Sequence, residues 1–311
     1  DVFMEAVGND ETYDLLSPKH GEVVGQENAR EIFQMIIRGA WLTGEPGTFF
    51  IDRANEYNPV PALGSYEATN PCGEQPLLPY DVCNLGSINL GKFVKEDAFP
   101  GVDPDEGIDW DAFRTVVHLS THFLDNVIDA NRYPLPAIHD LAQNIRRIGL
   151  GVMGWADALI RLNLPYDSQP ARDLAEEMGG FIESTAWDES HNLAVERGPF
   201  AEYEGSALKQ RGLPPVRNSS IITIAPTGTI SRIASCSSGI EPHFALAWWS
   251  NVLWKDHEGT SSRLLDAPTS ITETLHKELG DDARVRNVLQ QIIETPDGAE
   301  SILKEHGPDP D

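Results

Sequence analysis

An amide, a thiol and a carboxyl group stand at alternate positions in one short segment of the chain, at Asn70, Cys72 and Glu74. In an extended segment or a tight loop, this spacing points the three side chains to one side. Pro71 stiffens the approach to the thiol, and Gly73 allows backbone or ligand to come close. The segment therefore predicts a small catalytic cluster that contacts one substrate.

The carboxylate decides which chemistry the thiol suits. A negative charge beside a thiol raises the pKa of the thiol, which is unfavourable for a thiolate nucleophile. The segment holds no histidine that could act as a base for it. The cluster suits a thiol that loses a hydrogen atom, with Glu74 serving as base to the substrate. The simpler alternative is a buried cysteine among turn-forming neighbours.

A second candidate site is the loop Pro226-Thr227-Gly228-Thr229-Ile230-Ser231. The β-branched run before it, over residues 219–225, predicts a buried strand that leads directly into the loop. Free N–H groups and the Thr and Ser hydroxyls can bind phosphate without a lysine. The loop thus predicts a site for the phosphates of a substrate, and the alternative is an ordinary glycine-containing turn.

Residues 149–154 fit the pattern G-x-G-x-x-G, but their context argues against a dinucleotide site. Such a fingerprint has to follow a strand and open a helix. Residues 138–148 are helical in pattern, and Arg146 and Arg147 stand where an apolar strand would be needed. Tight helix packing explains the glycines better. A nicotinamide-dependent dehydrogenase stays as an alternative that requires a strand before Gly149.

Metal and disulfide sites are not expected. The three cysteines, Cys72, Cys83 and Cys236, are odd in number and form no C-x-x-C pair. This pattern argues against a secreted disulfide framework and against a zinc site. His118 and His122 have the spacing of one helical turn, which could bind a metal, but a solvated helix face is expected there.

Length and charge limit the remaining possibilities. The 311 residues are enough for one large domain or two small ones. No run of about 18 apolar residues occurs, so no membrane span is expected. The chain begins at Asp1 without a signal peptide, which predicts an internal fragment of a longer, cytoplasmic protein. A net charge of −26 repels phosphate backbones, so no nucleic-acid partner is expected.

The acidic surplus also predicts a salt response. An ordinary acidic surface is one explanation, and we favour the other, adaptation to molar salt. Crowded carboxylates repel each other and destabilise the compact state, whereas 1 M salt shortens the Debye length to about 3 Å. We expect the melting temperature of the intact protein to rise steeply as KCl goes from about 0.1 M to the molar range. A neutral osmolyte should only partly reproduce the rise, and a flat melting temperature would contradict the adaptation.

Apolar spacing, caps and breakers predict the other elements. We predict helices over residues 26–42, 109–131, 141–162 (broken at its glycines) and 168–197, and two or more helices within 271–306. Residues 49–67 and 69–84 are rich in proline and glycine and are predicted as loops. The predicted fold class is α/β.

Several segments together resemble one family. Residues 70–80 (NPCGEQPLLPY) and 83–90 (CNLGSINL) resemble the finger-loop region of ribonucleotide reductases, most closely the adenosylcobalamin-dependent, class II, large chains. Residues 147–155 (RIGLGVMGW) are also similar to the family. Residues 225–231 (APTGTIS) and 237–242 (SSGIEP) resemble its substrate-phosphate loop and the segment after it. The resemblance runs from about residue 26 to about residue 254.

The resemblance implies a fold. It implies part of the ten-stranded α/β barrel of this family, with the radical cysteine at the tip of a loop that passes through the barrel. Residues 1–68 would end the first barrel half and approach the finger loop. Residues 69–90 would form the finger loop, and residues 91–311 would form a second barrel half that is incomplete at its C-terminus.

The resemblance also implies roles for the site residues. Cys72 would carry a thiyl radical that removes the C3′ hydrogen of a ribonucleotide, and Glu74 would accept the proton of the 3′-hydroxyl. Asn70 would orient the sugar hydroxyls, with Pro71 and Gly73 also at the substrate. Cys83 would be one of two redox cysteines that end as a disulfide. Its partner would lie upstream of the chain, because no cysteine precedes Cys72.

The implied activity is reduction of ribonucleotides, expected to be diphosphates, to 2′-deoxyribonucleotides for DNA precursor synthesis. The implied cofactor is adenosylcobalamin, with no metal ligands expected in the chain. The implied partners are the nucleotide, a thioredoxin- or glutaredoxin-type reductant that acts through a C-terminal tail outside the chain, and a second copy in a homodimer.

With half of the redox pair missing, the chain by itself is not expected to turn over. Two alternatives stay open: a class I large subunit that needs a separate metal-radical subunit, and a segment that is active only within the full-length chain.

Overall fold

The computed structural model describes residues 1–95, 106–255 and 261–295. Over these ranges the architecture is mixed helix and strand, so the predicted α/β class is confirmed. The chain divides into two compact units, Asp1–Pro79 and Tyr80–Asp311. The division falls inside residues 69–90, which the sequence predicts as one finger loop. The described strands form four two-stranded sheets and no closed barrel, so the ten-stranded barrel stays a prediction.

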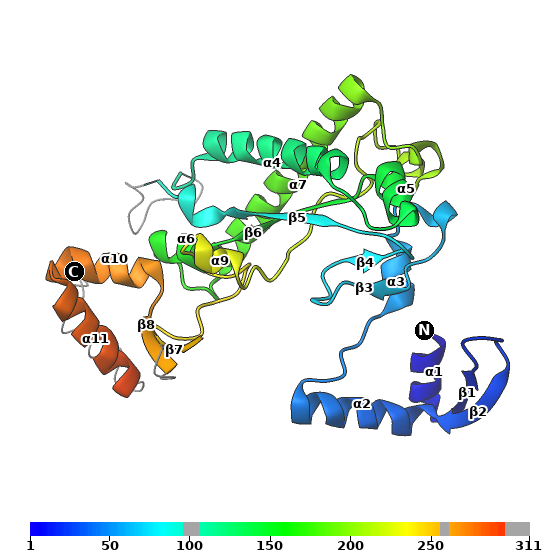
Figure 1. Ribbon diagram of the computed structural model, residues 1–311, viewed down its shortest axis with the longest axis horizontal. Helices are drawn as coiled ribbons and strands as arrows, with labels where there is room; N and C mark the ends of the chain where they lie inside the picture. The colour runs from blue at the N-terminus through cyan, green and yellow to red at the C-terminus, as the bar shows by residue number, and fades with distance from the viewer. Residues whose placement is uncertain (96–105, 256–260, 296–311) are drawn as a thin grey trace. The chain divides into compact units, whose positions relative to one another are not determined.

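The smaller unit carries two antiparallel strand pairs and three helices (Figure 1). Its elements are α1 (Val2–Asn9), β1 (Thr12–Leu16), β2 (Val23–Asn28), α2 (Ala29–Thr43), α3 (Ile51–Glu56), the 3₁₀ turn η1 (Pro61–Leu63), β3 (Ala68–Thr69) and β4 (Pro76–Leu77). Helix α2 begins three residues later than predicted, because Asn28 Oδ1 caps it by accepting from Glu31 N at 2.9 Å. The predicted loop 49–67 contains the short helix α3.

The larger unit contains the long helices. Its elements are β5 (Asn84–Asn89), η2 (Leu90–Lys92), α4 (Trp110–Ala130), α5 (Pro136–Ile145), β6 (Ile148–Met153), α6 (Trp155–Arg161), α7 (Gln169–Arg197), η3 (Tyr203–Gly205), α8 (Ala207–Gln210), α9 (Ile230–Ile233), β7 (Trp248–Lys255), β8 (Ser261–Asp266), α10 (Thr269–Leu279) and α11 (Asp282–Glu294). Helices α4 and α7 agree with the predictions for 109–131 and 168–197, and the first residues of those ranges, Asp109 and Ser168, are N-caps that accept from backbone N–H groups. Residues 296–306 of the last predicted helical range lie outside the described residues.

Strand β6 corrects the prediction of a helix over 141–162. Arg146 takes a left-handed conformation (φ 46°) and ends α5, and β6 then pairs in parallel with β5, Asn84 opposite Ile148. The six residues of β6 are all buried. The run therefore lacks the alternation of apolar and polar residues that would distinguish a strand from a helix. A Cβ at Gly151 would collide with the carbonyl oxygen of Thr223. The glycines therefore serve close strand packing, not the helix packing that the sequence predicted.

The segment before the loop 226–231 is also less regular than predicted. It lies beside β6 and joins it by one parallel bridge, Leu150 to Ile222, with Thr223 N donating to Leu150 O at 2.9 Å. Ile221 and Thr223 are buried, whereas Ile222 and Ile224 are 37% and 41% exposed. The predicted strand over 219–225 is therefore wrong, because the segment forms only this single bridge, whereas the predicted burial holds for Ile221 and Thr223.

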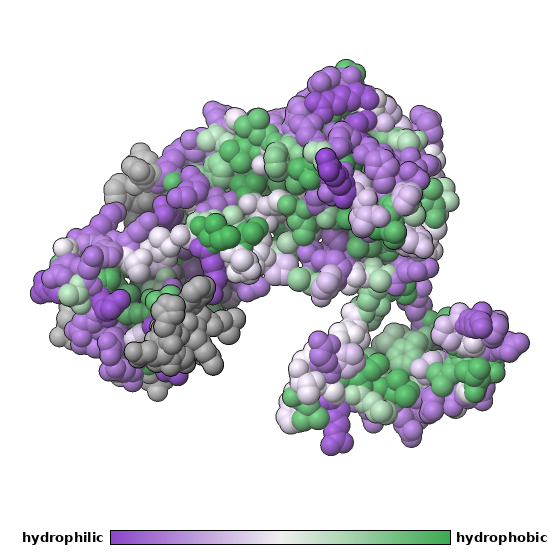
Figure 2. All heavy atoms as spheres, viewed as in Figure 1, coloured by the Kyte–Doolittle hydropathy of each residue, from purple (hydrophilic) through white to green (hydrophobic). Residues whose placement is uncertain are grey.

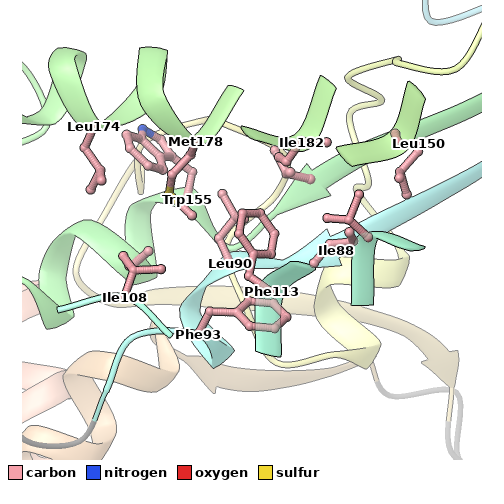
Figure 3. Packing of buried hydrophobic residues seen from close by; sticks show 14 of the residues in the cluster. Ile88, Leu90, Phe93, Ile108, Phe113, Leu150, Trp155, Leu174, Met178 and Ile182 are labelled. Carbon is pink, nitrogen blue, oxygen red and sulfur yellow. The ribbon is translucent and has the colours of Figure 1, made fainter. Parts of the chain in front are cut away.

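The core of the larger unit lies between the parallel strands β5 and β6 and the long helices α4 and α7. Figure 3 shows Ile88 and Leu90 from the β5 segment packed with Phe113 of α4 and with Met178 and Ile182 of α7. Helices α4 and α7 run side by side along it (Figure 1). Because α4 connects β5 to β6, it supplies the crossover that a parallel pair requires. This core holds the ends of both strands, beside which Cys83 and the loop 226–231 lie.

A buried charge network ties α4 to the start of β6. The Asp125 side chain is fully buried and accepts from Arg146 Nε at 2.8 Å and from Asn218 Nδ2 at 2.9 Å. Burial alone would lower the pKa of Arg146, but hydrogen bonds from its guanidinium to Asp129 and Asp125 raise it. The two arginines that seemed to exclude a strand therefore lie just before it and are neutralised by ion pairs.

The His118 and His122 face of α4 is not solvated as predicted. The two imidazoles lie against α7, where their Nδ1 atoms are 3.0 and 3.2 Å from the carboxylate oxygens of Glu189. In the part of the chain that the structure describes, no group of three or more His, Cys, Asp or Glu side chains is arranged to hold a metal ion. The pair thus contributes to the contact between α4 and α7.

Apolar side chains also reach the surface (Figure 2). On α4, Leu119 and Phe123 are 64% and 66% exposed, and Trp41 of α2 is 81% exposed. Among the described helices, none combines the length and the apolar character that crossing a bilayer requires.

Candidate active site

Cys72 lies at the tip of a two-stranded hairpin. Strands β3 and β4 pair Thr69 with Pro76, and Gly73 N donates to Asn70 O at 3.0 Å, which closes a four-residue turn. Pro71 and Cys72 occupy the two central positions of this turn. Gly73 follows with φ 88°, a conformation that favours glycine. The turn presents the Cys72 thiol to solvent.

The two polar partners of the thiol differ in how they are held. Asn70 Oδ1 accepts from Gln75 N at 3.0 Å, so the side chain of Asn70 braces the hairpin and its orientation is fixed. Glu74 is half-buried, and its Oε2 atom is shielded from solvent without a hydrogen-bond partner among the described residues. A shielded oxygen without a partner is one that a hydrogen-bond donor of a bound ligand would satisfy. The hairpin therefore brings the three predicted groups together as an oriented amide, an open thiol and a free carboxylate oxygen.

Cys83 belongs to the larger unit and precedes β5 by one residue. Its Sγ is half-buried and lies 3.6 Å from Asn84 O. A Cβ built on Gly149 would come within 3.0 Å of this sulfur and 3.2 Å of Thr223 Cβ. Gly149 thus leaves the space into which the sulfur packs against β6. This is a role that the G-x-G-x-x-G pattern does not reveal.

A buried ion pair holds the segment that carries Cys83. Arg147 Nε donates to Asp81 Oδ2 at 2.9 Å, and the exposed fractions of the two side chains are 2% and 0%. Asp81 stands two residues before Cys83, and Arg147 stands two residues before Gly149. Removing one partner of such a pair leaves an uncompensated buried charge, so loss of either side chain is expected to destabilise this end of the two strands. Sequence reasoning missed this pair, because its members are 66 residues apart.

The loop 226–231 follows the opposite, carboxyl-terminal end of the parallel strands. Thr227 takes a left-handed conformation (φ 56°), and Thr227 O accepts from Ser231 N at 3.0 Å as α9 begins. Thr227 Oγ1 accepts from Gly239 N at 2.7 Å, and Ser231 Oγ lies 2.9 Å from Ser238 Oγ. Two of the predicted hydroxyl donors, Thr227 and Ser231, are therefore held in place by the segment 237–239. The Thr227 hydroxyl, used there as an acceptor, still has its own hydrogen to donate.

A cavity of about 500 Å³ adjoins the loop. It is lined by Gly228 and Ser231 of the loop, by residues 235–238, and by aromatic side chains that include Phe244 and Trp248. Ligands of open α/β sheets bind beyond the carboxyl ends of the strands, which is where this cavity lies. Cys236 is on its wall, and burial, with a smaller contribution from the Asp157 charge, raises the pKa of this thiol to about 11.

Asp157 is a further residue at this edge that sequence reasoning missed. It lies in the first turn of α6, just beyond β6, and is buried. Its carboxylate accepts from Ser237 N at 2.6 Å and from Ser270 Oγ at 3.2 Å, and it lies 3.3 Å from His243 Nε2. Burial alone would raise the pKa of Asp157, but these three partners outweigh it and lower the pKa. An acidic residue directly after the glycine-rich segment is the signal that could have singled it out.

The predicted residues thus form three groups. Asn70, Cys72 and Glu74 lie within one hairpin loop of the smaller unit, and their joint action on one substrate stays a prediction. Cys83 and the loop 226–231 both belong to the larger unit, but the strand register places them at opposite ends of the parallel strands.

A comparison with protein families gives one match. The family described as "Ribonucleotide reductase, barrel domain" matches residues 1–215 and 213–306. The match covers both units and all the candidate site residues.

Individual relatives agree with the family match. The chain is 47% identical over 295 residues to a protein of Thermoplasma acidophilum named vitamin B12-dependent ribonucleoside-diphosphate reductase. The aligned region covers 95% of this chain and 36% of the relative. A protein of the same name from Mycobacterium tuberculosis is 44% identical over 80% of this chain and 34% of its own length. The ribonucleoside-diphosphate reductase large chain of Encephalitozoon cuniculi is 31% identical over 78% of this chain and 37% of its own length. The chain thus spans about a third of the length of these relatives.

Proposed function

Because the chain belongs to the ribonucleotide reductase family, we propose that the full-length protein reduces ribonucleoside diphosphates to 2′-deoxyribonucleotides by thiyl-radical chemistry. The observation that supports this most strongly is the hairpin that carries Asn70, Cys72 and Glu74, with an exposed thiol and a free carboxylate oxygen. The described chain would contribute part of a ten-stranded barrel and one of its redox cysteines.

Each side chain of the hairpin has one task in this reaction. The Cys72 sulfur, after losing its hydrogen atom, removes the hydrogen from C3′ of the ribose. Glu74 accepts the proton of the 3′-hydroxyl as general base. Asn70 keeps its amide oxygen on Gln75 N, so its Nδ2 group is the one that donates to the sugar hydroxyls. The loop 226–231 would bind the diphosphate.

Cys83 would supply half of the reducing equivalents. Together with a cysteine from elsewhere in the full-length protein it gives up two electrons and two protons, and a disulfide forms. The C2′–O bond breaks, the oxygen leaves as water, and a C2′–H bond takes its place. A reductant of the thioredoxin or glutaredoxin type would then restore the two thiols. We expect the protein to act as a homodimer.

We propose adenosylcobalamin as the cofactor, because the Thermoplasma and Mycobacterium relatives carry vitamin B12 in their names. When bound, this cofactor would supply the carbon-centred radical that starts the reaction. The residues present fit such a group in one respect: Cys72 is exposed at a hairpin tip, where a bulky radical source can reach it.

The proposal is tested by the requirements for activity. Full-length protein should reduce ribonucleoside diphosphates under anaerobic conditions with adenosylcobalamin and a dithiol, and without a second subunit. The assay measures deoxyribonucleotide formation, with Cys72→Ser protein as the blank. Activity that needs an iron- or manganese-containing partner would instead favour a class I large subunit, an alternative that the name of the Encephalitozoon relative leaves open. No deoxyribonucleotide under either condition would refute the proposed function.

A further inference from the structure

Asp157 is positioned to control the shape of the proposed phosphate loop through hydrogen bonds to residues outside that loop. The chain of contacts begins at the carboxylate, where Ser237 N donates to Asp157 Oδ2 at 2.6 Å. Ser237 O in turn accepts from Gly154 N at 2.8 Å, so residue 237 is held on both of its backbone groups. We define residues 237–239 as the strap.

The strap reaches the loop 226–231 at two points. Gly239 N donates to Thr227 Oγ1 at 2.7 Å, and Ser238 Oγ lies 2.9 Å from Ser231 Oγ. Gly239 has φ 45°, and a Cβ there would come within 3.1 Å of Ala225 O. The strap therefore packs closely on the start of the loop and engages its first and last hydroxyl side chains.

The carboxylate is itself fixed from two further sides. Ser270, at the start of α10, donates its hydroxyl to Asp157 Oδ1 at 3.2 Å, and His243 Nε2 lies 3.3 Å from the same oxygen. Asp157 and Ser270 are both buried. An ionised acceptor makes stronger hydrogen bonds than a neutral one. The strap is thus anchored by a charge whose partners come from α10 and from the segment after the strap.

We propose that Asp157 is a positioning residue for the substrate diphosphate: through the strap it keeps the Thr227 and Ser231 hydroxyls in the geometry that binds phosphate. This inference rests on the proposed function of the loop. It assigns a role to a residue whose hydrogen-bond partners, Ser237, Ser270 and His243, all lie outside the loop 226–231. The ionised carboxylate, and not the volume of the side chain, is what the strap requires.

The test is Asp157→Asn in the full-length protein, assayed as the holoenzyme. The variant keeps the size of the side chain and loses its charge. We expect KM for a ribonucleoside diphosphate to rise about tenfold, the size of one charged hydrogen bond, while kcat stays within about twofold. Inorganic pyrophosphate, used as a competitive inhibitor, should lose affinity by the same factor. If Asp157 had a purely structural role, Asp157→Asn would lower kcat and the melting temperature as well as raise KM.

Two further variants sharpen the result. Ser270→Ala removes one donor but keeps the charge, so its KM should rise by a smaller factor than that of Asp157→Asn. Glu273→Gln is the matched control, because Glu273 lies on α10 together with Ser270 and forms an exposed ion pair with Arg161. Its KM and pyrophosphate inhibition should equal those of the unaltered protein. If Asp157→Asn and Ser270→Ala both leave KM and pyrophosphate inhibition unchanged, the proposal is overturned.

Amide hydrogen exchange separates this proposal from the proposed function. Asp157→Asn should speed exchange at Ser237 and Gly239, and Glu273→Gln should not. Unaltered protein that forms no deoxyribonucleotide would refute the proposed function, whatever the exchange shows. Unaltered protein that is active, combined with strap exchange that Asp157→Asn does not alter, would refute the positioning role alone.

Discussion

Replacing Cys72 by serine is expected to abolish ribonucleotide reduction by the full-length protein. An alcohol O–H bond is too strong to yield its hydrogen atom, so the serine cannot become the radical that attacks C3′. The exchange changes one exposed atom at the tip of a hairpin, so folding and nucleotide affinity should be retained. The measurement is deoxyribonucleotide formed per protein, together with the dissociation constant of the substrate.

Two glutamate variants of the same hairpin, one at the site and one as its control, accompany this experiment. Glu74→Gln should slow the reaction strongly and leave nucleotide affinity nearly intact, which is a loss of transition-state stabilisation. Glu67→Gln, an exposed glutamate at the base of the same hairpin, should change neither quantity. Retention of even a few per cent of activity in Cys72→Ser would remove Cys72 from its proposed role.

Replacing Cys83 by serine is expected to stop multiple turnover while leaving the first chemical steps in place. Radical formation on Cys72 and consumption of substrate need no electrons from Cys83, whereas completion of each cycle does. Serine is close to cysteine in size and should fit the space that Gly149 leaves, so the ends of β5 and β6 should keep their packing. The measurement is the amount of normal product per protein in the presence of excess dithiol.

The oxidised form of the unaltered protein gives the independent check. After turnover without external reductant, mass spectrometry of the full-length protein should find Cys83 in a disulfide with a cysteine that precedes this chain in sequence. A free Cys83 thiol after such turnover would contradict its role as reductant. Cys72 should not be the partner, since in the proposed mechanism it recovers its hydrogen at the end of the cycle.

Local signals determined much of what was predicted correctly. Helices α4 and α7 begin at Asp109 and Ser168 because these side chains cap free N–H groups within three residues of themselves. The turn at Cys72 likewise depends on neighbours, with Pro71 at a central position and Gly73 in a left-handed conformation. The grouping of Asn70, Cys72 and Glu74 follows from such short-range geometry. Sequence alone was therefore sufficient to place the three groups in one short loop, whereas their catalytic role stays a prediction.

Strand β6 shows where local signals were insufficient. Its run Ile148-Gly-Leu-Gly-Val-Met153 is apolar throughout and buried on both faces, so no alternation distinguishes it from a helix. The deciding interactions are its pairing with β5, some sixty residues away in sequence, and the buried pairing of Arg146 with Asp125. Neither is visible in a window of a few residues.

The supporting residues of the site were decided by tertiary structure alone. Asp81 meets Arg147 across 66 residues, and Asp157 meets Ser237 across 80. The chemistry of a thiol, an amide or a carboxylate is a property of its own atoms, so the sequence by itself determined which groups could react. The orientation and charge state of a group depend on what the fold packs against it. Long-range contacts therefore determined how Cys83 and the loop 226–231 are held, and only the folded chain reveals them.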